Sequence, residues 1–415
     1  MEVVVLGAGV TGVTTAYFLA AEGHDVTIVD SENSVALGTS GANAGFVAPN
    51  DSFAWAAPSA PLELLKSIFK QDTGLSIRPQ RDTAMYAWCL AFLAQCTKRR
   101  NIANSIVQLK IALYSQIVQL ELTKSLSLQF EQRQSGSFYL FRAQEELNRA
   151  YVHRQFFEDF GLNQRVLAME EVAEIEPALG RLRTLFAGAI FGVTDGSGDC
   201  AAFTRQLAER AVATGRLKFA GGQDVLGLIS ADGRVEGVQL RDHVLRAETY
   251  VLCLGTGSAR VAATLGLKLP IYPVKGFAAT VPVHEGAQIP ERPGVDQTAL
   301  VAWSSMGDRL RLCSGAQISG YDTSWSEADR LRILRLGEAL FGDSLDYDKA
   351  DFRAGLRPMT PAGPPIVGRS RFPNLFLNTG HGHLGWTMAS GTARALVDLM
   401  MGRRYEASCI TTDSA

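Results

Sequence analysis

The chain has 415 residues, of which 47% are hydrophobic and 20% are charged. This composition is typical of a folded soluble protein and excludes intrinsic disorder or a coiled coil as a description of the whole chain. Since a single hydrophobic core stops growing at roughly 250–300 residues, the length predicts two domains. Forty basic and 42 acidic residues give a net charge of −2, so a nucleic-acid partner is not expected.

The six cysteines form no Cys-x-x-Cys pair, and no Cys/His group has zinc spacing. This usage is typical of a reducing compartment, and we predict a cytoplasmic protein. The apolar stretch from Val3 to Ala21 lacks the basic flank of a signal peptide, and glycines and threonines interrupt it. A buried strand followed by a buried helix explains it better than a membrane span.

The first elements form a β-α-β unit. Val3–Leu6 is an apolar run typical of a strand buried on both faces, Val10–Glu22 has helical periodicity, and Val26–Val29 is a second buried strand. This order predicts a parallel sheet. A long, mostly helical region from Pro61 to about Leu128 follows.

The rest of the chain alternates short strands with a few helices. Strands are predicted at 137–142, 187–191, 217–219, 225–229, 235–240, 247–254 and 375–378, and helices at 201–213, 326–341 and 386–401. Tyr272–Val281, Ala299–Ser304 and Arg309–Ala316 are predicted to form antiparallel strands of a second sheet. The predicted fold class is α/β, with a Rossmann-like domain and a separate α+β domain.

A glycine-rich turn follows the first strand directly. Gly7 permits a tight turn, Gly9 lets a pyrophosphate approach the backbone, and Gly12 lets the helix pack on the strand. Asp30 ends the next strand, where an acid binds ribose hydroxyls. The predicted pyrophosphate contacts are Gly7, Gly9, Val10, Thr11 and Gly12. A turn without a ligand is the alternative, and the motif does not distinguish NAD from FAD.

Two later turns have the same character. Residues 251–258 carry a strand into a small-residue turn at Gly255, and residues 378–387 lead into the last helix. The free N–H groups at the start of that helix would stabilise negative charge on a ligand. His381 and His383 form a His-x-His pair, but no third ligand accompanies them, so no metal site is predicted.

Six motifs together resemble the D-amino-acid dehydrogenase branch of the D-amino-acid oxidase-like flavoproteins. They are GAGVTG at 7–12, TSGANAG at 39–45, AWAAP at 54–58, IYPVKGF at 271–277, GLRPMTP at 355–361 and NTGHGHLGWTMASG at 378–391. The resemblance implies non-covalent FAD and oxidative deamination of a D-amino acid to a 2-oxo acid, with hydride transfer from the α-carbon to flavin N5. It also implies electron transfer to a quinone or other carrier, and peripheral contact with the cytoplasmic face of the membrane.

The resemblance also implies roles for single residues and a domain plan. An FAD-binding domain is expected from 1–60, 165–270 and 345–405, a substrate domain from 61–164 and 271–344, and a tail from 406–415. Val225 is expected at the adenine and His381 beside the flavin ring. The further cofactor contacts are Ser40, Asn43, Ala44, Gly45, Gly255, Gly380, Gly385, Trp386 and Thr387.

The resemblance implies that Arg357 anchors the substrate carboxylate. A guanidinium binds a carboxylate through two parallel hydrogen bonds and stays charged at any working pH. The alternative is an arginine paired with a nearby acid such as Asp351. Tyr272 and Tyr321 are candidates for a second hydrogen bond to that carboxylate or for pocket walls, although each, judged alone, is more typical of packing.

Other functions remain open at this point. The same fold could serve an oxygen-using oxidase of glycine, sarcosine or a cyclic imino acid such as D-proline or D-hydroxyproline. A non-catalytic dinucleotide-binding subunit and an NAD-dependent dehydrogenase are further alternatives. The short amphipathic helix at 61–70 could touch a membrane surface, although packing on its own domain is the more common role of such a helix.

Overall fold

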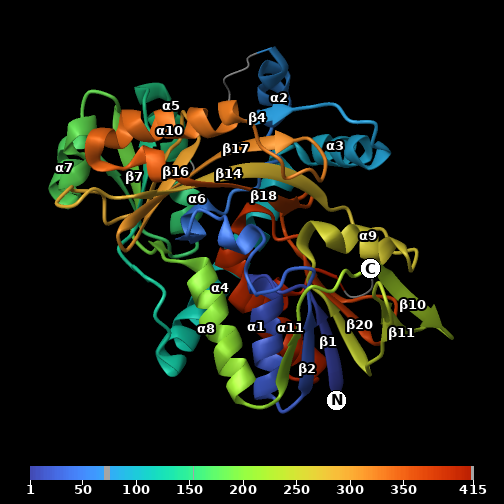
Figure 1. Ribbon diagram of the computed structural model, residues 1–415. Coiled ribbons are helices and arrows are strands. Elements are labelled where there is room, and N and C mark those ends of the chain that lie inside the picture. The colour runs from blue at the N-terminus through green and yellow to red at the C-terminus, as the bar shows by residue number, and fades with distance from the viewer. Residues whose placement is uncertain (70–74, 153, 413–415) are drawn as a thin grey trace.

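The structure, a computed structural model, describes residues 1–69, 75–152 and 154–412. Two sheets dominate it, one in each half of the molecule (Figure 1). The first has the order β19-β20-β13-β1-β2-β9, and its strands are parallel apart from the edge strand β19. Its strands are β1 Glu2–Leu6, β2 Asp25–Val29, β9 Leu217–Ala220, β13 Thr249–Leu252, β19 Ile366–Arg369 and β20 Leu375–Thr379.

Helices cover one face of this sheet, and a small sheet with one helix covers the other. Apolar side chains of β1 and β2 alternate between two cores, as expected of strands that are buried on both faces. The helices of the first face are α1 Val10–Ala21, α4 Lys98–Leu126, α8 Cys200–Ala213 and α11 Gly385–Met400. The other face carries α9 Ser258–Ala263, β10 Gly227–Ala231, β11 Arg234–Gln239 and β12 Val244–Leu245.

The second sheet is mostly antiparallel, in the order β18-β14-β17-β16-β15-β5-β7-β6, with β4 paired to β17. Among its described strands, only the β15–β5 and β17–β4 pairs are parallel. Its strands are β4 Leu75–Ile77, β5 Ser137–Phe141, β6 Gln164–Leu167, β7 Gly188–Gly192, β14 Tyr272–Pro282, β15 Gly294–Asp296, β16 Val301–Met306, β17 Arg309–Ile318 and β18 Asp351–Met359. The predicted α/β class with a parallel and a separate antiparallel sheet is confirmed.

The remaining helices and strands surround this second sheet or join the two halves. α7 and α10 pack on its main core, and α2 and α3 pack on a smaller core with β14. These elements are α2 Ala60–Phe69, α3 Thr83–Gln95, α5 Gln144–Val152, α6 Arg154–Glu158, α7 Met169–Ile175, α10 Glu327–Phe341, β3 Phe46–Val47 and β8 Gly196–Ser197. The amphipathic helix predicted at 61–70 is α2, and Lys70 lies outside the described residues.

Helix starts follow their capping residues. The Asp199 carboxylate accepts a hydrogen bond from the Ala202 N–H at 3.0 Å, so α8 begins at Cys200, one residue before the predicted start. Ser326 and Asp329 form a reciprocal capping box at the start of α10.

Sheet membership differs from the expected domain plan in three places. β18 belongs to the antiparallel sheet, where it pairs with β14 from Tyr272 to Thr280, although the sequence placed 345–405 with the first domain. β6 and β7 also join that sheet, and α4 packs against α11 beside the parallel one. The tail packs on β19 through a hydrogen bond from the Val367 N–H to the Thr411 hydroxyl, with Cys409 fully buried.

Among residues 1–69, 75–152 and 154–412, no helix is both long and apolar enough to cross a bilayer. All six cysteines are free thiols.

Candidate active site

A cavity of about 860 Å³ lies between the two sheets. Its walls include the carboxyl-end turns of β1, β2, β13 and β20, where ligands bind in open parallel sheets. The opposite wall comes from β14, β17 and β18 of the antiparallel sheet. Almost all of the predicted site residues line this cavity; Gly12, Tyr272 and Tyr321 do not.

The first glycine turn is shaped by close backbone contacts. Gly7 has φ of +110°, and a β-carbon on it would lie 2.8 Å from the carbonyl carbon of Cys253. A β-carbon on Gly12 would collide with the Gly7 carbonyl, which is why Gly12 acts in helix packing and stays outside the cavity. Gly9 precedes α1 without any side-chain cap, so the turn presents backbone N–H groups at a positive helix end.

Asp30 lies at the end of β2 and lines the cavity. Its carboxylate accepts hydrogen bonds from the Ala8 N–H at 2.6 Å and the Glu32 N–H at 2.9 Å. The aspartate therefore also holds the glycine turn in place. A carboxylate has about four acceptor sites, so these two contacts leave capacity for a ribose hydroxyl. Val225 lines the cavity too, on the loop that follows β9.

The loop from 39 to 45 lines the cavity and is held from both halves of the molecule. The Ser40 hydroxyl accepts a hydrogen bond from the Val10 N–H at 2.9 Å, and Asn43 folds back on the Ser40 carbonyl and the Gly45 N–H. From the other sheet, Arg311 donates to the Asn43 carbonyl at 3.0 Å. Arg311 is not predictable from the sequence, because nothing near it in the chain indicates which loop it supports.

The turn after β20 also meets the cavity. Gly380 has φ of +76°, and α11 begins at Gly385 without a side-chain cap. The Thr387 hydroxyl accepts a hydrogen bond from the Ala48 N–H at 3.2 Å, which ties α11 to the chain near β3. The buried Trp386 packs against Phe130 and Phe203. The turn therefore presents a second uncapped helix start to the same cavity.

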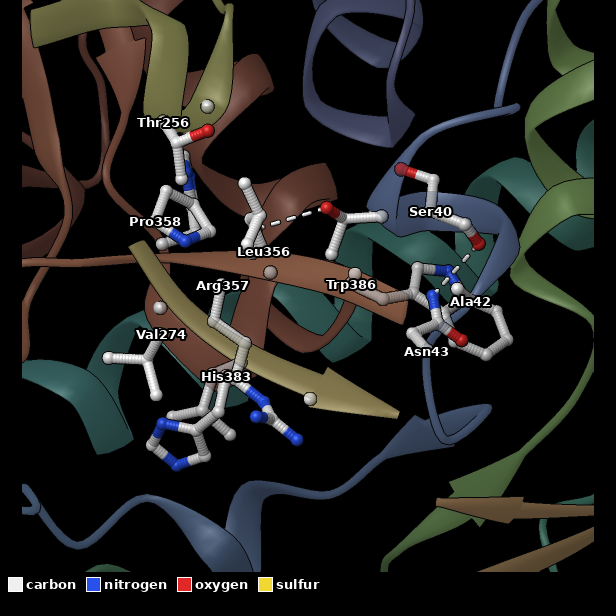
Figure 2. A pocket seen from close by; sticks show the side chains of 18 of the residues that line it. Ser40, Ala42, Asn43, Thr256, Val274, Leu356, Arg357, Pro358, His383 and Trp386 are labelled. Atoms are coloured by element: carbon white, nitrogen blue, oxygen red, sulfur yellow. Dashed lines mark hydrogen bonds between the residues drawn. The ribbon is translucent and has the colours of Figure 1, made fainter. Parts of the chain in front are cut away.

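Arg357 lies on β18 opposite Val274 of β14, and both side chains line the cavity (Figure 2). Nη1 donates to the Gly315 carbonyl at 2.8 Å, and burial lowers the pKa of the guanidinium. In the part of the chain that the structure describes, no carboxylate forms a salt bridge with it. Asp351, the alternative partner, pairs instead with Arg353 at 2.9 Å. The cavity wall therefore carries a half-buried cation that keeps further N–H groups for an anionic ligand beside its bond to Gly315.

The two tyrosines lie elsewhere. The Tyr272 hydroxyl donates to Asp82 at 2.8 Å, and its ring packs against Trp88 and Tyr321. Tyr321 is 46% exposed. Neither lines the cavity, so their position does not support direct contact with a ligand there. Burial and the hydrogen bond to Asp82 raise the pKa of Tyr272, which keeps the phenol neutral.

Both histidines of the His-x-His pair line the cavity and are neutral. Burial lowers the pKa of His381 to about 3, and its Nε2 lies 3.0 Å from the Thr392 hydroxyl. Burial and the charge of Arg357 lower the pKa of His383 to about 4. His383 stacks on Trp55 with ring centroids 4.8 Å apart, and Figure 2 shows it beside Arg357.

The residues present fit a bound FAD. Two helix starts whose N-cap residues provide no side-chain cap face the cavity, and the glycine turn keeps its surface clear of side chains. Four cavity residues also carry buried polar atoms that have no hydrogen-bond partner among the residues that the structure describes, as expected of a site that hydrogen-bonds a ligand. They are Ser314, Asn378, His383 and Trp386.

Comparison with known proteins identifies the family. Residues 2–399 match the DAO family, FAD dependent oxidoreductase, and the chain belongs to this family. It is 40% identical to a D-amino acid dehydrogenase of Bradyrhizobium diazoefficiens, over 100% of this chain and 98% of that protein. It is 41% identical to a D-amino acid dehydrogenase of Chromohalobacter salexigens, over 97% and 96% of the two chains.

Solved structures share the fold. Glycine oxidase from Geobacillus kaustophilus superposes with a TM-score of 0.75 at 21% identity, covering 99% of this chain and 98% of that one. Iminodiacetate oxidase from Chelativorans sp. gives a TM-score of 0.72 at 21% identity, covering 98% and 96%. The family match makes the protein an FAD-dependent oxidoreductase, and the solved structures share its two-sheet fold, as the sequence motifs predicted.

Proposed function

We propose that the protein oxidatively deaminates D-amino acids to 2-oxo acids and passes the electrons to a carrier such as a quinone. The observation that supports this most directly is Arg357, a half-buried cation in the wall of the cofactor cavity that has no carboxylate partner in the described structure. Full-length relatives at about 40% identity bear the name D-amino acid dehydrogenase, which supports the amino-acid substrate. Arg357, His381 and the glycine turns then have the roles that the sequence resemblance implied.

The chain's own residues orient and shield the substrate. FAD, when bound, supplies the two-electron oxidation by taking a hydride from the substrate α-carbon. Arg357 binds the substrate carboxylate through its fork and fixes the direction of the α-carbon. The uncapped start of α11 favours negative charge that develops on the cofactor. Val274 and Trp88 give this part of the cavity apolar walls, and Trp88 is fixed by a hydrogen bond to the Met359 carbonyl at 2.9 Å.

An anaerobic substrate screen tests this function. The yellow holoenzyme is mixed with D- and L-amino acids, glycine, sarcosine, D-proline and D-hydroxyproline, and bleaching of the flavin is followed. We expect D-amino acids to bleach it faster than their L-enantiomers, and a quinone or dye to restore the colour faster than oxygen does. Rapid peroxide formation in air with glycine or sarcosine would favour an oxidase. A flavin that no amine reduces would favour a non-catalytic subunit.

We further propose that α2 and α3 contact the cytoplasmic face of the membrane, where a quinone carrier dissolves. The two helices pack on one small core, and each exposes large apolar side chains to solvent. This apolar patch consists of Leu62, Leu65, Tyr86, Leu90 and Leu93, with exposed fractions from 42% to 69%. The exposed Arg81, Lys98, Arg99 and Arg100 lie close to it in the sequence and would complement anionic lipid headgroups.

A further inference from the structure

Asp51 lines the same cavity as Arg357, and the mechanism above does not use it. It ends a short 3-10 helix, Pro49–Asp51, two residues before Phe53 and four before Trp55, which also line the cavity. His383 contacts the main chain of Asp51 and lies within range of the charge of Arg357.

A second aspartate lies behind Asp51 and is fully hydrogen-bonded. Asp195 accepts hydrogen bonds from Ser137 Oγ at 2.5 Å, from Tyr139 Oη at 2.8 Å, and from the main chain and side chain of Asn50 at 3.1 and 2.9 Å. A β-carbon on Gly192 would lie 2.6 Å from Asp195 Oδ2, so this glycine makes room for the cluster. The four donors stabilise the negative charge of Asp195.

The Asp51 carboxylate has no such support. No hydrogen bond or ion pair reaches its oxygen atoms from any residue that the structure describes. Burial and the negative charge of Asp195 raise the pKa of Asp51 to about 7. Burial raises the pKa of Asp195 as well, but its four hydrogen-bond donors oppose that effect. Asp51 has no such donors, so of the two acids it is the one that takes up a proton near neutral pH.

We propose that Asp51 accepts a proton from the α-ammonium group of the substrate. This inference rests on the proposed function, because a D-amino acid is the ligand considered. One ammonium N–H bond breaks and one carboxyl O–H bond forms, which converts Asp51 to the neutral acid and leaves the substrate as a neutral amine. The amine lone pair is then available as the hydride leaves the α-carbon. The proton on Asp51 is later lost to solvent.

The surroundings of Asp51 favour this transfer. Where burial shields charges from solvent, as it does at Asp51, an ammonium–carboxylate pair is less stable relative to the neutral amine and acid than it is in water. The titratable and charged groups around Asp51 are Asp195 and Tyr139 behind it, and His383 with Arg357 beyond it. His383 and Tyr139 are neutral at pH 7, so neither competes as a cation or as an anion.

The test is a pH series of flavin reduction under anaerobic conditions. In the wild-type holoenzyme the rate constant should rise through an inflection near pH 7, since Asp51 accepts a proton only when ionised. Asp51→Asn should lower the limiting rate by about 100-fold or more and abolish this inflection. Asp51→Glu should restore part of the rate and the inflection. Asp308→Asn, at an exposed turn, is the matched control and should behave as wild type.

A second measurement needs no substrate. The infrared spectrum of the wild-type holoenzyme should gain a protonated-carboxyl band as the pH falls through 7, and Asp51→Asn should lack it. An unchanged rate and inflection in Asp51→Asn would overturn the inference while the proposed function stands. If no D-amino acid reduces the wild-type flavin, the proposed function fails. The infrared band then still reports whether Asp51 carries a proton near pH 7, and absence of the band overturns its role.

Discussion

Gly276 of β14 lies against the guanidinium of Arg357 on the neighbouring strand. A β-carbon on Gly276 would be 2.6 Å from Cζ of Arg357, which is closer than a β-carbon approaches any non-bonded heavy atom in proteins. The cause is the strand register: Val274 pairs with Arg357, so Gly276 lies diagonally beside it on the same face of the sheet. The direction of the predicted substrate anchor therefore depends on a residue that has no side chain.

Gly276→Ala should displace the guanidinium and weaken substrate binding. We expect kcat/KM for a D-amino acid to fall about 10–100-fold, mainly through KM, with FAD still bound. Arg357→Lys keeps the charge but loses the fork, and should cost about 2–5 kcal/mol. Gly180→Ala is the control, because its β-carbon would make an ordinary 3.5 Å contact with Ala173. Wild-type kinetics for both Gly276→Ala and Arg357→Lys would remove Arg357 from the substrate site.

Gly9→Val should abolish retention of FAD. The new side chain would place its β-carbon 3.2 Å from Ser40 Oγ and extend over the surface that the uncapped helix start presents. The purified variant should be colourless, with a circular-dichroism spectrum like that of the wild-type apoprotein. Ala21→Val, at the exposed end of the same helix, should stay yellow. A fully loaded Gly9→Val protein would refute the pyrophosphate assignment.

His381 should make the fold sensitive to mild acid. Its pKa is about 3 when folded and near 6.5 when unfolded, so the unfolded chain binds the proton first as the pH falls. The contribution of neutral His381 to the free energy of unfolding is complete above about pH 6.5 and is lost as the pH falls below that value. Between pH 7 and pH 5, wild type should lose about 2 kcal/mol more unfolding free energy than His381→Gln. Urea unfolding at the two pH values measures this difference. His284→Gln, at an exposed position, should follow wild type.

Leu65→Asp combined with Leu90→Asp should weaken membrane binding. Both side chains are more than half exposed, so the fold should tolerate the changes. We expect the double variant to co-sediment less with anionic vesicles, while its reduction by a D-amino acid stays unchanged. Leu331→Asp, at a 38% exposed position on α10, tests whether any exposed leucine has this effect. Equal sedimentation of all three proteins would argue against contact through the apolar patch.

Local patterns were sufficient to predict much of the fold. The β-α-β unit was placed within one or two residues, because buried parallel strands are continuous apolar runs and the helix between them is short. The three-residue strand β4 was missed within the long helical region, since its partner β17 is more than 200 residues away. The sheet that β18 joins was not predicted either, because its partner β14 is also distant in the sequence.

Some site residues could be predicted from the local sequence, and the position of others depended on tertiary packing. The glycines of the first turn lie together because only one or two residues separate them in the sequence. The loop at 38–45, which follows β2, meets this turn where the Val10 N–H donates to the Ser40 hydroxyl. Tyr272 and Tyr321 were selected as chemically suitable side chains, but the packing of α3 gives the Tyr272 hydroxyl a partner in Asp82 outside the cavity. Asp51 was not selected, since a single aspartate in a loop carries no local signal.

The sequence by itself determined the cofactor turn and the family, because the contacts of that turn are made by residues close together in the chain, and their backbone shape requires glycine. Only the tertiary structure decided which charges remain without partners. Asp351 is six residues from Arg357 yet pairs with Arg353, and Asp51 shares its surroundings with Asp195 and His383. Burial, neighbouring charge and free hydrogen-bonding capacity are properties of the packed chain, since they depend on residues that the sheets bring together from far apart.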